Sequence, residues 1–457
     1  MGKKDTTLKI EAHLLKNGLS ITVKNKTYTI IYPAYIWAPL SKETKNMLVD
    51  NIVFTSTHFL SVVLDKDTLV YNTNFPLCES FIFRNHIEDI LDTERVDGVP
   101  FQSYMKKLYN ATFEFTDKQT SVPPFVESPG KGIHTLKSPV IVPFTFGKES
   151  LFVALMAKKM GMNPILVYFE DPMERYETEY KLKRLSAMGK MLDCPVHFVK
   201  NDVGLFRGGL AFGKHSDVGW GVQTTLYTIM CLPFVYYYNA HHVLYGNEYA
   251  NNEYEYAQGW KLNHSYDQTI FWMKQQSVLV NVLSSGRCSV QSMLEPLDEP
   301  NIFYLLHSLY PEFGRHQFSC RAEKPLLKGS QWCHKCYKCA RMYLFASAFG
   351  VDPSAIGFKK NLLIKEMFKD YLFSSLESGD PKDLDFAFYT LLQKKVQNEV
   401  VDLFKKKRLP HLKSWSWYVD YYTSLRTMHN VPSVHASKLM SVYRKGLKEF
   451  RSYLLNI

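Results

Sequence analysis

The sequence predicts an α/β protein with a doubly wound parallel sheet at its centre. Two observations predict this class. Between residues 139 and 200, short apolar segments typical of buried strands alternate with longer segments of helical periodicity. Residues 358–457 show helical periodicity only. Strands that alternate with helices pair in parallel, because each helix carries the chain back to the edge at which the next strand begins.

A β-rich accessory domain is expected over residues 1–116. Two segments that alternate apolar and polar residues flank a turn signal at residues 16–18, which indicates a hairpin. The alternation continues over residues 26–34, and the segments 51–64 and 67–75 favour two more strands. The region holds no cluster of catalytic side chains, so its task cannot be inferred from its residues.

A central domain is predicted over residues 138–357, after a linker at 117–137 that is rich in proline and glycine. Within it we expect strands at 139–144, 163–170 and 194–200, and helices at 151–161 and 174–192. Residues 358–457 form a basic helical region in this prediction, with helices at 361–376, 384–406 and 433–455.

Composition excludes several classes of protein. Hydrophobic residues make up 46% of the 457 residues and charged residues 22%, which is typical of a folded domain and not of a disordered chain. No apolar run follows the charged start of the chain, and Pro233 and Asn239 interrupt the longest apolar stretch. We therefore expect no membrane partner and a cytoplasmic location, which the eight cysteines fit because most lie in no disulfide-like pattern.

Four cysteines near the end of the central domain form the most specific motif. Cys320, Cys333, Cys336 and Cys339 follow the pattern C-x12-C-x2-C-x2-C. Two C-x2-C turns place thiolates on one side of a knuckle, which is the arrangement of structural zinc sites. The sequence therefore predicts a Zn²⁺ site of four cysteines; an iron–sulfur cluster and unligated thiols are the alternatives.

A small polar loop at residues 145–150 separates the first predicted strand of the central domain from its first helix. Backbone N–H groups and a helix N-terminus at such a loop favour an anion. Thr145 and Ser150 add hydroxyl groups, Lys148 adds a cation, and Gly147 lets a ligand approach the backbone. The alternative is an ordinary turn in which Ser150 caps the helix.

This loop resembles the PP-loop of the ATP pyrophosphatase superfamily, S-G-G-x-D-S. Thr145 and Ser150 stand at the two serine positions, Phe146 and Gly147 at the glycines, and Glu149 at the aspartate. Together with the cysteine motif, the loop resembles 7-cyano-7-deazaguanine synthases and the epimerases of UDP-N-acetylmuramoyl-L-alanyl-L-glutamate. The resemblance covers residues 139–350.

The resemblance implies an adenine nucleotide alpha hydrolase-like fold and an AMP-forming enzyme of the ligase or epimerase type. Such an enzyme uses ATP to adenylate a carboxylate and releases pyrophosphate; the substrate is a small molecule, a peptide or a protein terminus. The implied cofactors are ATP, Mg²⁺ and Zn²⁺, with Mg²⁺ on Glu149 or Glu248. The loop residues implied to bind ATP are Thr145, Phe146, Gly147, Lys148, Glu149 and Ser150, of which Lys148, Glu149 and Ser150 are also implied to be catalytic.

Side chains outside the loop complete the expected site. Asn247 and Glu248 follow an expected strand, where ligands bind in doubly wound sheets, and Glu170 ends another. Asn247 is expected to bind a phosphate or ribose oxygen, and Glu170 the ribose. Glu248 is expected to be catalytic, by holding Mg²⁺ or a substrate amine. Lys214, on a glycine-rich segment, is expected to be catalytic by neutralising the α-phosphate. Further candidates for contacts with phosphate, ribose or substrate are Arg207, Asp171, His264, Arg287 and Arg321.

The net charge is +11, and residues 357–457 hold 18 Lys and Arg against 10 Asp and Glu. A basic region of this kind favours a polyanionic partner such as nucleic acid, although a solvated helical face explains it equally. Two other functions therefore stay open: an RNA-modifying enzyme of the PP-loop type, and a nucleotide-binding scaffold without catalysis.

Overall fold

The computed structural model describes residues 6–125, 136–173, 175–257, 259–263, 265–318, 320, 330–373 and 382–457. The chain divides into two compact units, each built from separate segments. The first unit comprises Met1–Phe144, Ala157–Met173 and Ala187–Met293, and the second comprises Thr145–Met156, Glu174–Ser186 and Leu294–Ile457. The domain boundaries expected from the sequence stay a prediction.

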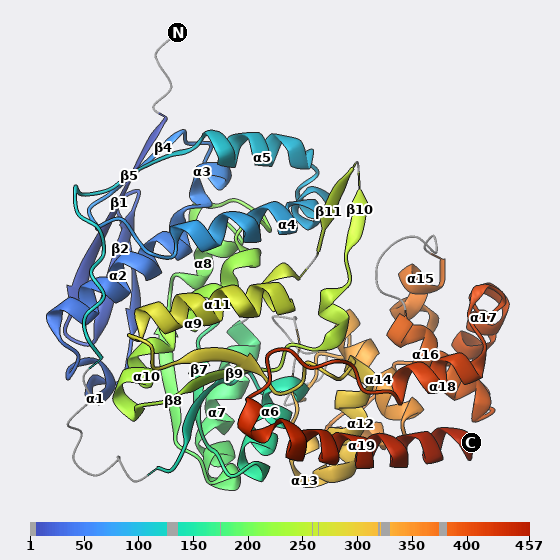
Figure 1. Cartoon of the computed structure of the whole chain (residues 1–457). Coiled ribbons are helices and arrows are strands. Elements are labelled where there is room, and N and C mark those ends of the chain that lie inside the picture. Colours follow the sequence, from blue (N-terminus) through green and yellow to red (C-terminus); the bar gives the residue numbers. More distant parts are fainter. Residues whose placement is uncertain are drawn as a thin grey trace. The chain divides into compact units, whose positions relative to one another are not determined.

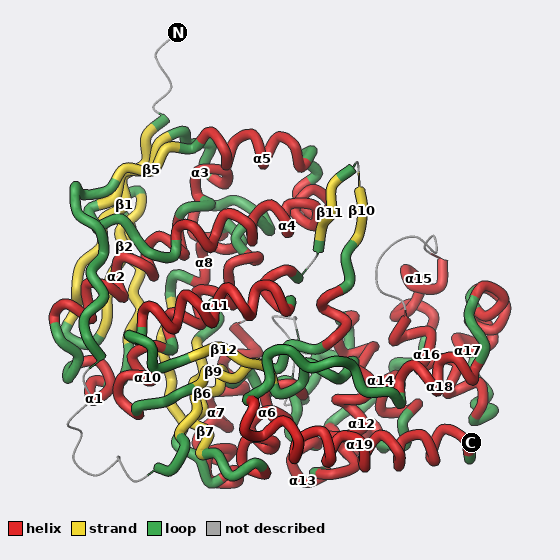
Figure 2. Tube along the Cα trace, viewed as in Figure 1, coloured by secondary structure: helices red, strands yellow, loops and turns green. Residues whose placement is uncertain are grey.

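The first unit is built on a large mixed sheet that is mostly parallel. Figures 1 and 2 show its strands. Its order in the described residues is β12-β9-β6-β7-β8-β3-β2-β1-β4-β5. The antiparallel pairs are β1–β2, β2–β3 and β3–β8. The strands are β1 (Thr7–Leu15), β2 (Gly18–Val23), β3 (Lys26–Ile31), β4 (Thr68–Tyr71), β5 (Thr112–Glu114), β6 (Pro139–Pro143), β7 (Asn163–Phe169), β8 (Val196–Asn201), β9 (His242–Tyr245) and β12 (Ser289–Ser292).

The α/β class is thereby confirmed, whereas a wholly parallel sheet is not. The N-terminal strands join the central ones through the antiparallel pairing of β3 with β8, so they do not form a sheet of their own. The expected hairpin is confirmed, with Leu15 opposite Gly18. A side chain at Gly18 would place its Cβ 1.9 Å from the carbonyl oxygen of Ile30, so this close approach of strands requires glycine.

In the parallel half of the sheet, the direction in which successive strands are added reverses at β6. The chain adds β7 and β8 on one side of β6, and later β9 and β12 on the other. Because β6 and β9 are parallel, both strands end at the same edge of the sheet. Such a switch point is where ligands bind in open α/β sheets.

Helices accompany these strands in the first unit. They are α1 (Ala34–Trp37), α2 (Lys42–Thr57), α3 (Leu60–Val63), α4 (Glu79–Asp97), α5 (Phe101–Asn110), α8 (Gly204–Arg207), α9 (Gln223–Met230), α10 (Leu232–Tyr238) and α11 (Ile270–Leu283). A short hairpin of β10 (Glu255–Ala257) and β11 (Trp260–Leu262) stands apart from the large sheet. Helices α6 (Lys148–Lys159) and α7 (Arg175–Leu192) include residues of both units.

The strand expected at residues 51–64 is wrong, because these residues lie in α2 and α3. The hydroxyl of Ser41 caps α2 by accepting from the N–H of Thr44. Nearly every side chain from Met47 to Thr57 is buried, so tertiary packing outweighs the strand preference of the β-branched residues. The description of residues 1–116 as β-rich holds for β1–β5 and fails for α2, α4 and α5.

The second unit is helical in its described residues, apart from connecting loops (Figure 2). The helix expected at 433–455 is confirmed, whereas the one expected at 384–406 is two helices. Lys395 takes a left-handed φ of 55°, and the side chain of Asn398 caps the second helix. The helices are α12 (Glu299–Leu309), α13 (Pro311–Gly314), α14 (Tyr337–Ala348), α15 (Lys365–Phe373), α16 (Lys382–Gln393), α17 (Glu399–Lys407), α18 (Trp415–Tyr422) and α19 (Ser433–Leu455).

Among the helices that the structure describes, none combines the length and the apolar character needed to cross a bilayer.

Candidate metal centre and phosphate loop

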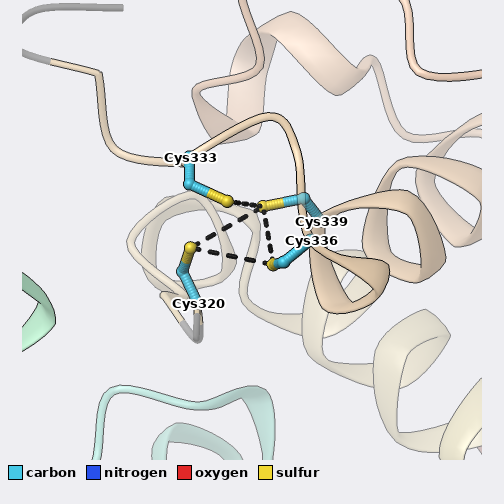
Figure 3. Close-up of side chains that lie close together, drawn as sticks. All are labelled: Cys320, Cys333, Cys336 and Cys339. Carbon is cyan, nitrogen blue, oxygen red and sulfur yellow. Dashed lines mark hydrogen bonds between the residues drawn. The ribbon is translucent and has the colours of Figure 1, made fainter. Parts of the chain in front are cut away.

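The four motif cysteines lie together in the second unit (Figure 3). Their sulfur atoms all lie within 4.8 Å of one another. The Sγ atom of Cys339 lies 3.5 Å from Cys336, 3.6 Å from Cys333 and 3.9 Å from Cys320. A tetrahedron with metal–sulfur bonds of about 2.3 Å has sulfur–sulfur edges of about 3.8 Å. The cluster is therefore a possible metal-binding site of the size that zinc requires.

Helix α14 and the turn before it hold the metal centre in shape. Cys336 is the residue that precedes α14, and Cys339 lies in its first turn, where the helix dipole favours thiolates. The ring of Trp332 stacks on Phe358 at 4.7 Å and is buried. His334 donates from Nδ1 to the carbonyl of Trp332 and accepts from the N–H of Lys359 at Nε2. Both ring nitrogens of His334 are thus engaged in hydrogen bonds, so this histidine does not take the place of a cysteine as a metal ligand.

The loop at residues 145–150 is closed by its own polar groups. The hydroxyl of Ser150 accepts from the N–H of Thr145 and donates to the carbonyl of Gly147, each at 3.2 Å. The hydroxyl oxygens of Thr145 and Ser150 lie 3.4 Å apart. Ser150 lies inside the first turn of α6, so it is not a residue that precedes the helix. A methyl group on Gly147 would lie 3.0 Å from the Glu149 carboxylate, which closes over this glycine.

Phe146 takes the backbone conformation of a glycine. Its φ is 63°, in the left-handed region that costs a side-chain-bearing residue about 1 kcal/mol or more. Its side chain is only 1% exposed, and its carbonyl accepts from the N–H of Phe318 at 2.8 Å. The loop therefore follows the left-handed path that a glycine would allow at this position, with the phenyl ring inside the fold.

Lys148, the cationic residue of the loop, is buried: its side chain is 5% exposed. Its ammonium group contacts Glu149 and lies 2.8 Å from Oε1 of Glu299, the first residue of α12. Arg341 contacts the other oxygen of Glu299 and lies 2.8 Å from Asp383. Burial raises the pKa of Glu299, but the charges of Arg341 and Lys148 outweigh it and hold the pKa below its usual value.

The remaining expected residues lie in the first unit and are described separately. Glu170 follows β7, and Asn247 and Glu248 follow β9; all three lie at the carboxyl edge of parallel strands. Asn247 is 7% exposed, and its Nδ2 has no hydrogen-bond partner in the part of the chain that is described. Burial raises the pKa of Glu170. Lys214 is exposed on the glycine-rich segment before α9.

Arg207, expected to reach a phosphate, is instead engaged within the first unit. Its guanidinium lies 2.8 Å from Asp171 and 4.4 Å from the ring centre of Trp220. Its side chain is almost fully buried. The guanidinium of Arg287 lies 5.2 Å from the ring centre of Phe125. His264 and Arg321 lie outside the described residues.

Comparisons with protein-family models and with curated proteins find no match to this chain.

Proposed function

We propose that the protein is an AMP-forming enzyme that uses ATP to activate a carboxylate. The observation that carries the proposal is the place of the loop 145–150: it follows β6 at the switch point of the sheet and leads into α6. The hydroxyl oxygens of Thr145 and Ser150 lie 3.4 Å apart in this loop, which also carries the ammonium group of Lys148. This set of donors suits the polyphosphate of a nucleotide.

A phosphate that binds Lys148 must replace one of the carboxylates that contact it, such as those of Glu149 and Glu299. The surroundings of these two carboxylates fit such a replacement. The side chain of Glu149 is 37% exposed and contacts Lys148 in its own helix turn, so it can give way to a phosphate. Glu299 is buried and anchored by Arg341, so it stays and keeps Lys148 in place. Carboxylate oxygens are the ligands that Mg²⁺ prefers, and either Glu149 or Glu248 is proposed to supply one.

In the proposed reaction, a carboxylate oxygen of the substrate forms a bond to the α-phosphorus of ATP. The bond from that phosphorus to the bridging oxygen breaks, and pyrophosphate leaves with the electron pair. Lys148, Thr145 and Ser150 stabilise the negative charge that develops on the leaving group. Ammonia or an amine then forms a bond to the carbonyl carbon of the acyl-adenylate and loses a proton, and the bond from that carbon to the phosphate oxygen breaks, so that AMP leaves with the electron pair. If a base instead removes a proton from the activated substrate, water attacks the carbonyl carbon afterwards and AMP leaves in the same way. Zinc on the four cysteines has a structural role in this proposal, because four protein ligands leave no open position.

Product analysis tests the proposal directly. The purified chain, incubated with ATP, Mg²⁺ and a panel of carboxylic acids, is expected to exchange labelled pyrophosphate into ATP when its substrate is present. AMP and pyrophosphate are the expected products. Formation of ADP and phosphate would overturn the proposal. Nucleotide binding without any exchange, over the whole panel, would favour the scaffold without catalysis.

Replacing Ser150 by alanine is expected to lower the rate of pyrophosphate release about a hundredfold, the usual loss when one transition-state donor is removed. The substitution removes the hydroxyl that closes the loop onto Thr145. Ser437→Ala, on the exposed face of α19, is the matched control and is expected to keep the rate. Equal rates for the two variants would exclude Ser150 from the active site.

A nucleic-acid partner is a second proposal, favoured by a cluster on α15 and α17. Phe373 is 52% exposed, and the ammonium groups of Lys365 and Lys407 lie 5.8 Å and 6.0 Å from its ring centre. An exposed aromatic ring beside cations suits a stacked base with its phosphates.

Phe373→Ala is expected to weaken binding of single-stranded RNA about tenfold, because stacking on one ring contributes about 1–3 kcal/mol. The affinity of the unmodified chain should fall steeply as salt rises. Fluorescence anisotropy with labelled oligonucleotides measures both effects. Phe271→Ala, at an exposed phenylalanine of α11, is the control. Absence of saturable binding by the unmodified chain would remove this second function.

A further inference from the structure

We propose that Arg341 is a positioning residue that couples the metal centre to the phosphate loop. The proposal rests on the proposed function, because it assigns the control of the same anion site. It predicts that pyrophosphate on the loop tightens the structure around the cysteines, although no cysteine belongs to the loop. The contacts of the second unit provide two separate connections for this coupling.

The first connection runs through side chains. Arg341 lies two residues after Cys339 in α14, so its backbone is fixed by the turn that carries the thiolates. Its Nη2 contacts Glu299 and lies 2.8 Å from Oδ2 of Asp383. The hydroxyl of Tyr422 donates to the other oxygen of Asp383 at 2.6 Å. Arg341 is therefore held from α16 and α18 while it grips the first residue of α12.

Glu299 passes this constraint on to the loop. Its two carboxylate oxygens contact different cations, Arg341 on one side and Lys148 on the other. Both Glu299 and Lys148 are largely buried, so water does not readily replace either partner. The position of the Lys148 ammonium group is thus fixed by a residue that is fixed in turn by α14.

The second connection runs through the backbone. The N–H of Phe318 donates to the carbonyl of Phe146 at 2.8 Å, and Phe318 precedes Cys320 by two residues. The ring of Phe318 is buried against Tyr180 and Trp332. The loop is therefore tied to both ends of the cysteine motif: to Cys320 through Phe146, and to Cys339 through Lys148. Since binding linkage is reciprocal, a metal that strengthens the binding of a loop ligand requires that this ligand strengthen the binding of the metal by the same factor.

Amide hydrogen exchange of the full, zinc-loaded chain tests the coupling, with inorganic pyrophosphate as the probe. In the unmodified protein, saturating pyrophosphate is expected to slow exchange about tenfold in the peptide 330–345, which carries three of the cysteines, as well as in 145–156. In Arg341→Gln, at pyrophosphate concentrations that again saturate the loop, the effect on 330–345 is expected to be smaller, because only the connection through Phe318 remains. Zinc content, measured before and after, verifies that pyrophosphate removes no metal.

Arg408→Gln is the matched control, because Arg408 forms a buried ion pair with Asp385 in the same unit and the hydrogen bonds of its side chain to described residues go to Asp385 and Tyr371. It is expected to keep the pyrophosphate effect on 330–345. A merely structural role of Arg341 would speed exchange equally with and without pyrophosphate, so the difference between the two states is the diagnostic quantity. If Arg341→Gln does not fold, Arg341→Lys keeps the charge but shortens the reach, and is expected to reduce the effect.

The failures of the two proposals are distinguishable. Protection confined to 145–156 in the unmodified protein overturns the coupling and leaves the proposed function intact. Equal protection of 330–345 in the unmodified protein and in Arg341→Gln overturns the role of Arg341. No binding of pyrophosphate by the unmodified protein overturns both.

Discussion

Removal of metal from the cysteine cluster is expected to unfold the second unit while the first unit keeps its structure. Structural zinc sites contribute about 10–16 kcal/mol of binding free energy, which is as large as the whole stability of a typical domain, about 5–15 kcal/mol. The expected midpoint of thermal unfolding of this unit therefore falls below room temperature in the presence of a strong chelator. Hydrogen exchange followed by peptide analysis measures the two units separately.

Elemental analysis should find zinc bound to the purified chain, and Cys339→Ser should lose it. Cys339 is the appropriate position because its sulfur lies within 3.9 Å of the other three. Cys194→Ser is the control, since Cys194 lies in the first unit, away from the motif, with its thiol donating to the carbonyl of Leu192. A chain that contains iron in place of zinc would support the iron–sulfur alternative. Unchanged exchange after chelation would show that the cysteines have no structural metal.

Local sequence patterns correctly predicted those parts of the fold whose structure is determined by residues that are close together in the sequence. The hairpin of β1 and β2, the strands β6, β7 and β8, and the cysteine spacing are of this kind. The pairing of β3 with β8 was not predicted by local patterns. Ile30 pairs with Asn201, which is far away in the sequence, and neither segment contains a signal that identifies the other strand. Helix α2 was not predicted for a related reason: its β-branched residues favour a strand locally, and only the surrounding core, in which they are buried, stabilises the helix.

The candidate site shows the same division. The residues of the loop 145–150 stand out by their order, because they resemble the pattern S-G-G-x-D-S between a strand and a helix. Glu299 and Asp383 carry no such signal: each is an acidic residue at the start of a helix, where acidic residues commonly interact with the helix dipole. Only their contacts with Lys148 and Arg341 distinguish them from caps. A search for sequence motifs alone would therefore miss these two carboxylates, which hold the loop in place.

Glu299→Gln is expected to destabilise the second unit by about 3–5 kcal/mol at pH 7, the scale found when one partner of a buried ion pair is removed. The amide keeps the shape of the side chain but leaves Lys148 and Arg341 as buried cations with one carboxylate fewer. Since Lys148 then lacks its buried partner, pyrophosphate release should fall as well. Urea unfolding, followed by exchange in the peptides of this unit, measures the loss.

The acid dependence of stability gives this prediction its sharpest test. The pKa of Glu299 is lower in the folded chain than in the unfolded one, because the charges of Arg341 and Lys148 outweigh burial. Its contribution is therefore fully present above the ordinary carboxyl pKa of about 4.3 and is lost as pH falls through the lowered value. The difference between the unmodified chain and Glu299→Gln should shrink below about pH 4. Glu449→Gln, on the exposed face of α19, should show no such difference at any pH. A constant difference between pH 7 and pH 3 would show that the loss comes from packing and not from the charge of Glu299.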